Sequence, residues 1–181
     1  MTDPIDEVVA LVDRDGHVVG SAPRSVVRRD NLLHSATAVL VRDPARRIYL
    51  HRRSDEKDWA PGHWDVAAGG VIAVGEEPVA SALRELEEEL GIVTDTLREL
   101  GTHLYEDDTT RCFEHAYEAV WDGPVRHQPE EVAEGRWATL AEVRQLLADP
   151  SIPFVPDTDH LLARLAAAGV EDYAAVDPSR G

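Results

Sequence analysis

The chain has 181 residues, enough for one domain with its own core and short for two. Apolar residues make up 43% and charged residues 29%, a globular rather than a disordered composition. The 35 acidic against 18 basic residues give a formal charge of −17, which argues against nucleic acid or an anionic membrane as partner. Cys112 is the only cysteine, so no internal disulfide can form, and no apolar stretch approaches the ~20 residues of a membrane span. We therefore expect a soluble, cytoplasmic protein.

The N-terminal half predicts mainly strands. In chain order, its predicted elements are a hairpin (5–12 and 17–20), a short helix or turn (23–30), two strands (35–41 and 47–51) and a polar loop (54–63). The hairpin and the helix form an N-terminal extension of about residues 1–31. The apolar run Ala36–Val41 favours a strand buried on both faces.

The C-terminal half mixes both element types. Its predicted elements are a Gly-rich strand end (64–72), a helix (77–90), two strands (98–105 and 111–121), a short strand ending at Trp137 and two helices (139–148 and 157–168). Pro78 lies in the first turn of the helix over 77–90, and Gly91 ends it. We expect the tail after Gly169 to be partly disordered. The irregular alternation predicts a single α/β domain over 1–181 with a mixed sheet.

The helix over 77–90 carries a cluster of acids. At 100° per residue, one apolar stripe contains Val79, Leu83, Leu86 and Leu90. The opposite side gathers Glu85, Glu88 and Glu89, and Glu87 lies on the flank. Like charges one turn apart cost an isolated helix roughly 0.2–0.5 kcal/mol, a repulsion that a divalent cation relieves. A glutamate run alone is most often a solvated face.

The residues around this cluster extend the pattern beyond a simple run. Gly69 and Gly70 lack side chains, so their backbone can approach a metal ion or a phosphate. Arg84 can reach Glu88 one turn later and Glu76 across the preceding loop, which would hold the acids in place. The full pattern is Gly70, five residues, Glu76, seven residues, Arg84, Glu85, Leu86, one residue, Glu88, Glu89, one residue, Gly91 and Ile92. A pattern this long argues against a solvated face.

This pattern resembles the Nudix box, and every defining position is filled. The resemblance implies the Nudix fold, an α/β/α sandwich around a mixed sheet, with the box as a loop–helix–loop that binds Mg²⁺ or Mn²⁺. It implies Glu85, Glu88 and Glu89 as metal ligands, the Gly69 carbonyl as a candidate backbone ligand, and Gly70, Glu76, Arg84 and Gly91 as structural support of the box. The implied reaction is hydrolysis of a diphosphate linkage in a small molecule, in which the metal polarises the phosphate and orients the attacking water.

A wider set of residues resembles one branch of this superfamily, which contains isopentenyl-diphosphate isomerase and isomerase-like Nudix hydrolases. The set comprises Leu33–His34, Arg53, Lys57, Pro61–Asp65, the box and Trp137. In the isomerases, the residues that match Arg53 and Lys57 hold the substrate diphosphate. The catalytic cysteine would fall at Gly69 and a metal-binding histidine at Val71, and neither residue can perform those tasks. The sequence therefore favours a hydrolase over an isomerase.

The general base is open among several acids. Glu88 and Glu89 belong to the box, whereas Glu131 and Glu134 lie in a polar loop before Trp137 that resembles the acid-bearing loop of the family. His34 is either a structural histidine or a site residue, and Trp59 and Trp64 either pack or stack on a substrate base. Cys112, in a predicted strand, is expected to be a buried core residue.

Two functions from different classes are compatible with the fold. A Nudix-fold ligand sensor without turnover would be expected to lose box glutamates, and none is lost here. An enzyme is therefore the favoured hypothesis. Nucleoside diphosphate derivatives, nucleotide sugars, coenzymes and isoprenoid diphosphates all stay open as substrates, and a homodimer rests on family analogy alone.

Overall fold

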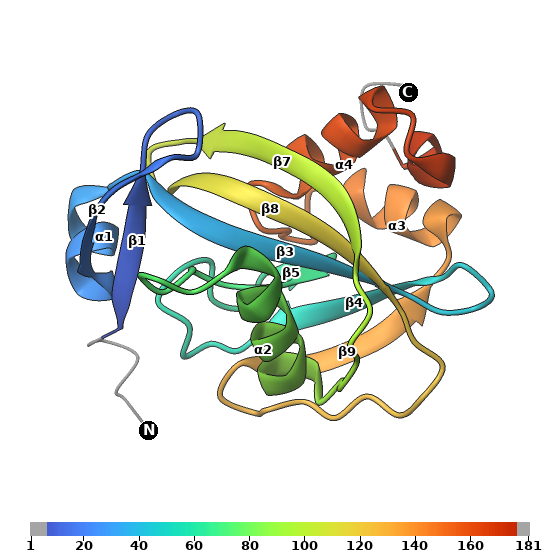
Figure 1. Ribbon diagram of the computed structural model, residues 1–181. Coiled ribbons are helices and arrows are strands. Elements are labelled where there is room, and N and C mark those ends of the chain that lie inside the picture. The colour runs from blue at the N-terminus through green and yellow to red at the C-terminus, as the bar shows by residue number, and fades with distance from the viewer. Residues whose placement is uncertain (1–6, 177–181) are drawn as a thin grey trace.

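The computed structural model describes residues 7–176 and centres on a long strand, β3 (His34–Arg42) (Figure 1). All nine residues of β3 are buried, as predicted for a strand covered on both faces. Its neighbours are β8 (Arg111–Val120), which runs parallel, and β6 (Ala67–Ala68), which runs antiparallel. β7 (Arg98–Glu106) pairs antiparallel with the outer side of β8. The sheet is therefore mixed, as the sequence predicted.

A second group of strands is built on β4 (Ile48–Arg53). β9 (Val132–Ala138) and the short β5 (Trp64–Asp65) pair antiparallel with β4 on its two edges. β4 meets β3 only at the pair Arg42 and Ile48. Because the two strands share this single corner, they diverge along their length and the sheet curls, which leaves room for a cavity between the two groups.

Helices cover both faces of the curled sheet (Figure 1). On one face, α2 (Pro78–Leu90) packs Leu86 and Leu90 into a core cluster with Val39 and Val41 of β3. On the other face lie α3 (Leu140–Leu147), α4 (Thr158–Ala167) and the 3₁₀ helix η2 (Glu171–Ala175), whose cluster includes Leu40, Ile48 and Leu162. This is the α/β/α arrangement that the sequence predicted. The sheet, with one core cluster on each face, lies between α2 and the C-terminal helices.

The predicted N-terminal hairpin is present as β1 (Val8–Val12) and β2 (Val18–Pro23), followed by the helix α1 (Arg24–Asp30). Its turn is closed by Asp13, whose carboxylate accepts hydrogen bonds from the backbone of Asp15 and His17, each at 2.9 Å. β1 extends the sheet by pairing Leu11 with His34 of β3. The hairpin therefore brings α1 beside the start of β3. The first residues of the predicted extension, 1–6, lie outside the described residues.

Part of the C-terminal tail is ordered: η2 follows Gly169, and the side chains of Tyr173 and Val176 are fully buried. Residues 177–181 lie outside the described residues, so the expectation of a partly disordered tail stays a prediction. One other expectation is wrong. Val79 of α2 is 44% exposed rather than part of the buried stripe, which includes Ser81 and Glu89 instead. Ser81 can be buried because its hydroxyl accepts a hydrogen bond from Arg84 at 3.3 Å, and Glu89 because it lines the cavity. None of the helices within 7–176 has the length and apolar character needed to cross a membrane.

Candidate active site

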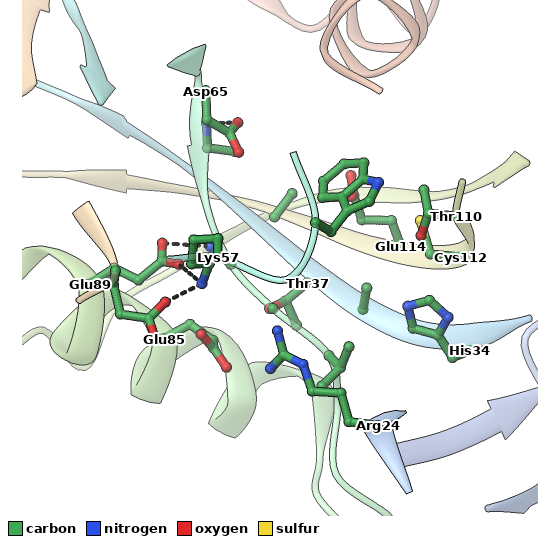
Figure 2. Close-up of a pocket in the computed structure, with 18 of the residues that line it drawn as sticks. Arg24, His34, Thr37, Lys57, Asp65, Glu85, Glu89, Thr110, Cys112 and Glu114 are labelled. Atoms are coloured by element: carbon green, nitrogen blue, oxygen red, sulfur yellow. Dashed lines mark hydrogen bonds and ion pairs between the residues drawn. The ribbon is translucent and has the colours of Figure 1, made fainter. Parts of the chain in front are cut away.

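A cavity of about 790 Å³ lies where the two strand groups diverge. Its wall combines segments far apart in sequence, including α1, β3, β8, α2 and the loop after β4. Figure 2 shows Glu85, Glu89 and Lys57 at one side of this cavity, Thr37 of β3 near the middle, and Glu114 and Cys112 at the other side. The structure therefore brings the glutamates of the predicted box into one cavity that is large enough for a substrate.

Glu89 is the most buried of the box acids, with only 2% of its surface exposed. Its carboxylate accepts a hydrogen bond from the backbone N–H of Gly69 at 3.2 Å and lies 3.6 Å from the Nζ of Lys57. Lys57 also donates to the carboxylate of Glu131. Lys57 thus links two of the candidate general bases.

Arg84 holds the remaining box acids together. Its Nε and Nη2 donate to the two carboxylate oxygens of Glu76 at 3.0 and 3.1 Å, and its Nη1 donates to Glu85 at 2.7 Å and to Glu88 at 3.1 Å. Both contacts predicted from spacing, to Glu76 across the loop and to Glu88 one turn later, are therefore present. The fork of the guanidinium fixes the loop before α2 relative to the helix.

The two glycines before the helix are close to other atoms. A Cβ on Gly69 would lie 2.0 Å from the carbonyl oxygen of Thr37, and one on Gly70 would lie 2.7 Å from the carboxylate of Glu85. Backbone and carboxylate occupy the space that a side chain would need. Gly91 ends α2 with a left-handed φ of 63°, a conformation that favours glycine.

Burial makes the paired acids hard to ionise in the absence of a bound cation. It raises the pKa of Glu89 to about 8, with the nearby Glu85 adding to the effect and Lys57 opposing it. Burial also raises the pKa of Glu85, against the opposing charge of Arg84. By contrast, Glu87 is exposed and lies outside the cavity lining, as its place on the helix flank predicted.

Arg53 lines the cavity but much of its guanidinium is already used. Its Nε and Nη2 donate to the carbonyl oxygen of Trp59 at 3.2 and 3.0 Å, and its Nη1 lies 3.9 Å from the carboxylate of Asp65. Two further arginines of α1, Arg24 and Arg28, also line the cavity. The sequence reasoning missed them, although they are basic residues in a strongly acidic chain, because only the fold places α1 against the cavity.

Several other candidates are now placed. His34 lines the cavity, its Nδ1 lies 2.9 Å from the carbonyl oxygen of Leu32, and burial lowers its pKa to about 4, so it is neutral at pH 7. Cys112 is buried, as predicted, and also faces the cavity. Glu134, considered as a base, instead accepts a hydrogen bond from Arg52 at 2.8 Å, is largely exposed and lies outside the lining.

The aromatic candidates differ in the same way. Trp59 lines the cavity, donates a hydrogen bond to Thr109 at 3.1 Å, and lies beneath the guanidinium of Arg53 at 5.5 Å. Trp64 is outside the lining and packs against the hydrophobic cluster under α3 and α4. Only Trp59 is placed to contact a ligand.

Residues 32–158 match the family model described as the NUDIX domain. This match covers the box, all strands from β3 to β9 and most of the residues that line the cavity. The chain belongs to the Nudix hydrolase family.

Relatives and solved structures agree with this membership. The chain is 46% identical over 170 residues to an uncharacterized Nudix hydrolase of Rhodococcus erythropolis, covering 88% of this chain and 92% of that one. It is 38% identical over 156 residues to one of Pseudomonas aeruginosa, covering 84% and 89%. A crystal structure from Deinococcus radiodurans superposes with a TM-score of 0.75 at 25% identity, covering 88% of this chain and 99% of that one. A MutT protein of Methanosarcina mazei, at 19% identity and a TM-score of 0.64, covers 77% and 96% and shares the fold.

Proposed function

We propose that this Nudix hydrolase cleaves a diphosphate linkage of a small molecule by attack of water on phosphorus, with Mg²⁺ or Mn²⁺ as its cofactor. The observation that carries the proposal is a pair of glutamates that face one cavity together with Lys57: Glu89 is buried, and the side chain of Glu85 is 13% exposed. The sequence and the fold of the box support it, since all its defining positions are filled.

The residues present fit a hard divalent cation. Two carboxylates one helical turn apart are buried, and the charge of Glu85 adds to the rise in the pKa of Glu89. Oxygen ligands of this kind are those that Mg²⁺ prefers, and we propose Glu85, Glu88, Glu89 and the Gly69 carbonyl as the ligands. When bound, the ion would supply the positive charge that polarises the phosphate oxygens and activates the water.

The protein's own cations bind and orient the diphosphate in this proposal. Lys57 is held between Glu89 and Glu131, so its ammonium group sits at the centre of the reacting region. Arg53 also lines the cavity. Its Nη1 is the guanidinium nitrogen least engaged by the protein, because its contact with Asp65 is 3.9 Å long. Phosphate oxygens that enter the cavity would gain donors from both residues.

A carboxylate then accepts the proton of the attacking water. As the water oxygen bonds to phosphorus, its proton passes to Glu88, Glu89 or Glu131, and the bridging P–O bond breaks with its electron pair leaving on the departing phosphate. Glu131 lines the same cavity and accepts a hydrogen bond from Lys57, so it is a candidate proton acceptor separate from the proposed metal ligands.

Two residues of the cavity wall favour hydrolysis over isomerisation. Gly69 and Val71 both line the cavity at the positions where the resemblance places the isomerase cysteine and histidine. Neither can deliver a proton to a double bond. The likeness to the isomerase-like branch stays a hypothesis about ancestry and substrate shape.

The test is turnover of a panel of diphosphate compounds with Mg²⁺ or Mn²⁺ by wild type, Glu89→Gln and the matched control Glu87→Gln. Loss of one ligand charge should lower kcat by ~10³-fold or more in Glu89→Gln, whereas the exposed Glu87 should tolerate the change. Equal activity of Glu89→Gln and wild type would contradict the proposal. Tight binding of a compound without turnover by wild type would instead indicate a ligand sensor.

A further inference from the structure

The side of the cavity away from the α2 glutamates carries a second set of carboxyl groups. Asp65 of β5, Glu114 of β8 and Asp157, directly before α4, come from three separate segments and all line the cavity. Glu114 is 5% exposed and the Asp65 side chain 13%. We call these three residues, with the hydroxyl of the adjoining Thr158, the acid-lined subsite. In Figure 2, Asp65 and Glu114 lie apart from Glu85 and Glu89, with Thr37 near the middle.

Few protein groups satisfy these carboxyl groups. Asp65 accepts a hydrogen bond from the backbone N–H of Ala67 at 3.0 Å, and its nearest cation is Arg53 at 3.9 Å. The Nε2 of His103 lies 3.1 Å from the carboxyl group of Glu114, whose acidic neighbours are Asp65 and Asp157. The acceptors of the subsite therefore outnumber the donors that the described residues direct toward them.

Asp157 shows the same imbalance at the end of a helix. An aspartate at an N-cap usually accepts hydrogen bonds from the backbone of the first turn, but the Asp157 side chain caps no N–H group of α4. Burial raises its pKa, and the charges of Glu114 and Asp65 add to the rise. A carboxyl group that faces a cavity and forgoes its cap is available to a ligand.

A buried hydroxyl group gives independent evidence of an occupant. Thr158, which directly follows Asp157, is 2% exposed and lines the cavity. Within residues 7–176, its side-chain oxygen has no hydrogen-bond partner. Leaving a buried polar group unpaired costs about 1–3 kcal/mol, a penalty that a hydrogen-bonding occupant removes. A cavity that only needed filling would be lined by apolar groups here.

We propose that the acid-lined subsite binds the part of the substrate attached to the diphosphate, and that this part is rich in hydroxyl or amino donors. The inference rests on the proposed function, which places the diphosphate at the α2 glutamates. A carboxylate only accepts hydrogen bonds, and a protonated carboxyl group still has an acceptor oxygen, so in either state these acids offer acceptors to a donor of the substrate. An apolar chain in this position would leave buried polar groups without partners, which is unfavourable. The substrate class is therefore a polar conjugate such as a nucleotide sugar or an amino-alcohol diphosphate, not an isoprenoid diphosphate.

A metal ion is the competing occupant. The ligand atoms of Cys112, Glu114 and Asp157 lie within 4.8 Å of one another, a spacing that could hold a cation. Burial, however, raises the pKa of the Cys112 thiol and of Asp157. A metal would have to displace both protons to bind there. A donor group of the substrate needs no such displacement, and it can also pair with the hydroxyl of Thr158.

The deciding experiment compares kcat/KM for UDP-glucose, CDP-ethanolamine and geranyl diphosphate in Mg²⁺. The variants are Asp157→Asn and Glu114→Gln, with Asp159→Asn, an exposed acid of the same helix outside the lining, as the matched control. Wild type should prefer one of the two polar compounds. Each subsite variant should lower kcat/KM for that compound roughly ten- to hundredfold, with geranyl diphosphate changed by less than about threefold.

Selectivity separates the subsite from the proposed function. A wild-type preference for geranyl diphosphate, or equal losses on all three compounds in the variants, would overturn the subsite while hydrolysis stands. No cleavage of any compound by wild type would remove the proposed function and the subsite with it. The identity of the preferred polar compound tells hydroxyl recognition from amine recognition.

Thermal unfolding supplies a second readout that a merely structural role would not give. Neutralising an unsatisfied acid should leave the unfolding midpoint unchanged or raise it, even as kcat/KM falls. A clear drop in the midpoint of both variants would mean that the acids hold the fold together. Mn²⁺ and Zn²⁺ are then titrated into a Glu85→Gln, Glu89→Gln double variant. A metal-induced rise in midpoint that disappears with Asp157→Asn would assign the cluster to a metal and overturn the proposal.

Discussion

The two ends of the cavity both present largely buried carboxyl groups, but the ends differ in how closely cations approach these groups. At the α2 end, Lys57 lies 3.6 Å from Glu89, and Arg84 donates to Glu85 at 2.7 Å. At the far end, the cation nearest to Asp65 is 3.9 Å away. The first end is a preassembled charge network that suits phosphates and a metal, whereas the second keeps acceptors open. In our proposal, the α2 end therefore performs the hydrolysis, and the far end binds the group attached to the diphosphate.

The largest change expected is one that damages both ends. In Gly69→Ala, the new Cβ would lie 2.0 Å from the carbonyl oxygen of Thr37, a backbone atom of the strand beneath both ends. Because backbone cannot rotate away, we expect a loss of about 3 kcal/mol or more in the free energy of unfolding, measured with urea. Gly20→Ala, with no atom within 4 Å of its Cβ, is the control and should change stability by less than about 0.5 kcal/mol. A stable Gly69→Ala protein would contradict the close contact.

A smaller change should damage the α2 end alone. In Gly70→Ala, the Cβ would meet the carboxylate of Glu85 at 2.7 Å, the movable end of a side chain. We expect less than about 1 kcal/mol of lost stability but ~10²-fold lower kcat, since one proposed ligand is displaced. The ratio of kcat/KM values between polar and apolar substrates should stay unchanged. A change in that ratio would show that the two ends are not independent.

The smallest effect concerns the far end and appears as a pH dependence. Burial raises the pKa of Asp65 from its ordinary value of 3.8 to about 6, and Arg53 opposes this rise only in part. Between these values the folded protein retains a proton that the unfolded chain has released, so stability falls as pH rises from about 4 to 6. Asp65→Asn lacks this proton and should gain stability relative to wild type over the same window, on the order of 1 kcal/mol above pH 6. Urea titrations at pH 4.5 and 7.5 measure it, and a difference between the two proteins that does not grow with pH would refute the buried-acid assignment.

Most of the fold was predictable because its signals are local. The Pro78 and Gly91 boundaries of α2 match the structure, and the hairpin, β3 and the two C-terminal helices agree within about two residues at most of their boundaries. The burial of Tyr173 and Val176 was not predictable, because they are isolated apolar residues without periodicity and they pack against segments distant in the chain. The exposure of Val79 was not predictable either, because a helical wheel gives relative angles but not the direction in which the helix faces.

The α2 end of the site was predictable for the same reason that the helix was. Arg84 reaches Glu88 because residues four apart in a helix are neighbours, whatever surrounds them. Arg24 and Arg28 could not be placed in this way. They enter the cavity only because β1 pairs with β3 and carries α1 beside it.

The sequence by itself determined the family, the helix that carries the glutamates and the Arg84 network, since these follow from spacing along one continuous segment. Tertiary structure alone decided that Glu131 faces the cavity and Glu134 does not, because that depends on the face to which each side chain is directed. It also decided the acid-lined subsite, whose carboxyl groups are separated by dozens of residues in the chain. No local pattern links such residues, and only the divergence of β3 and β4 brings them to one cavity.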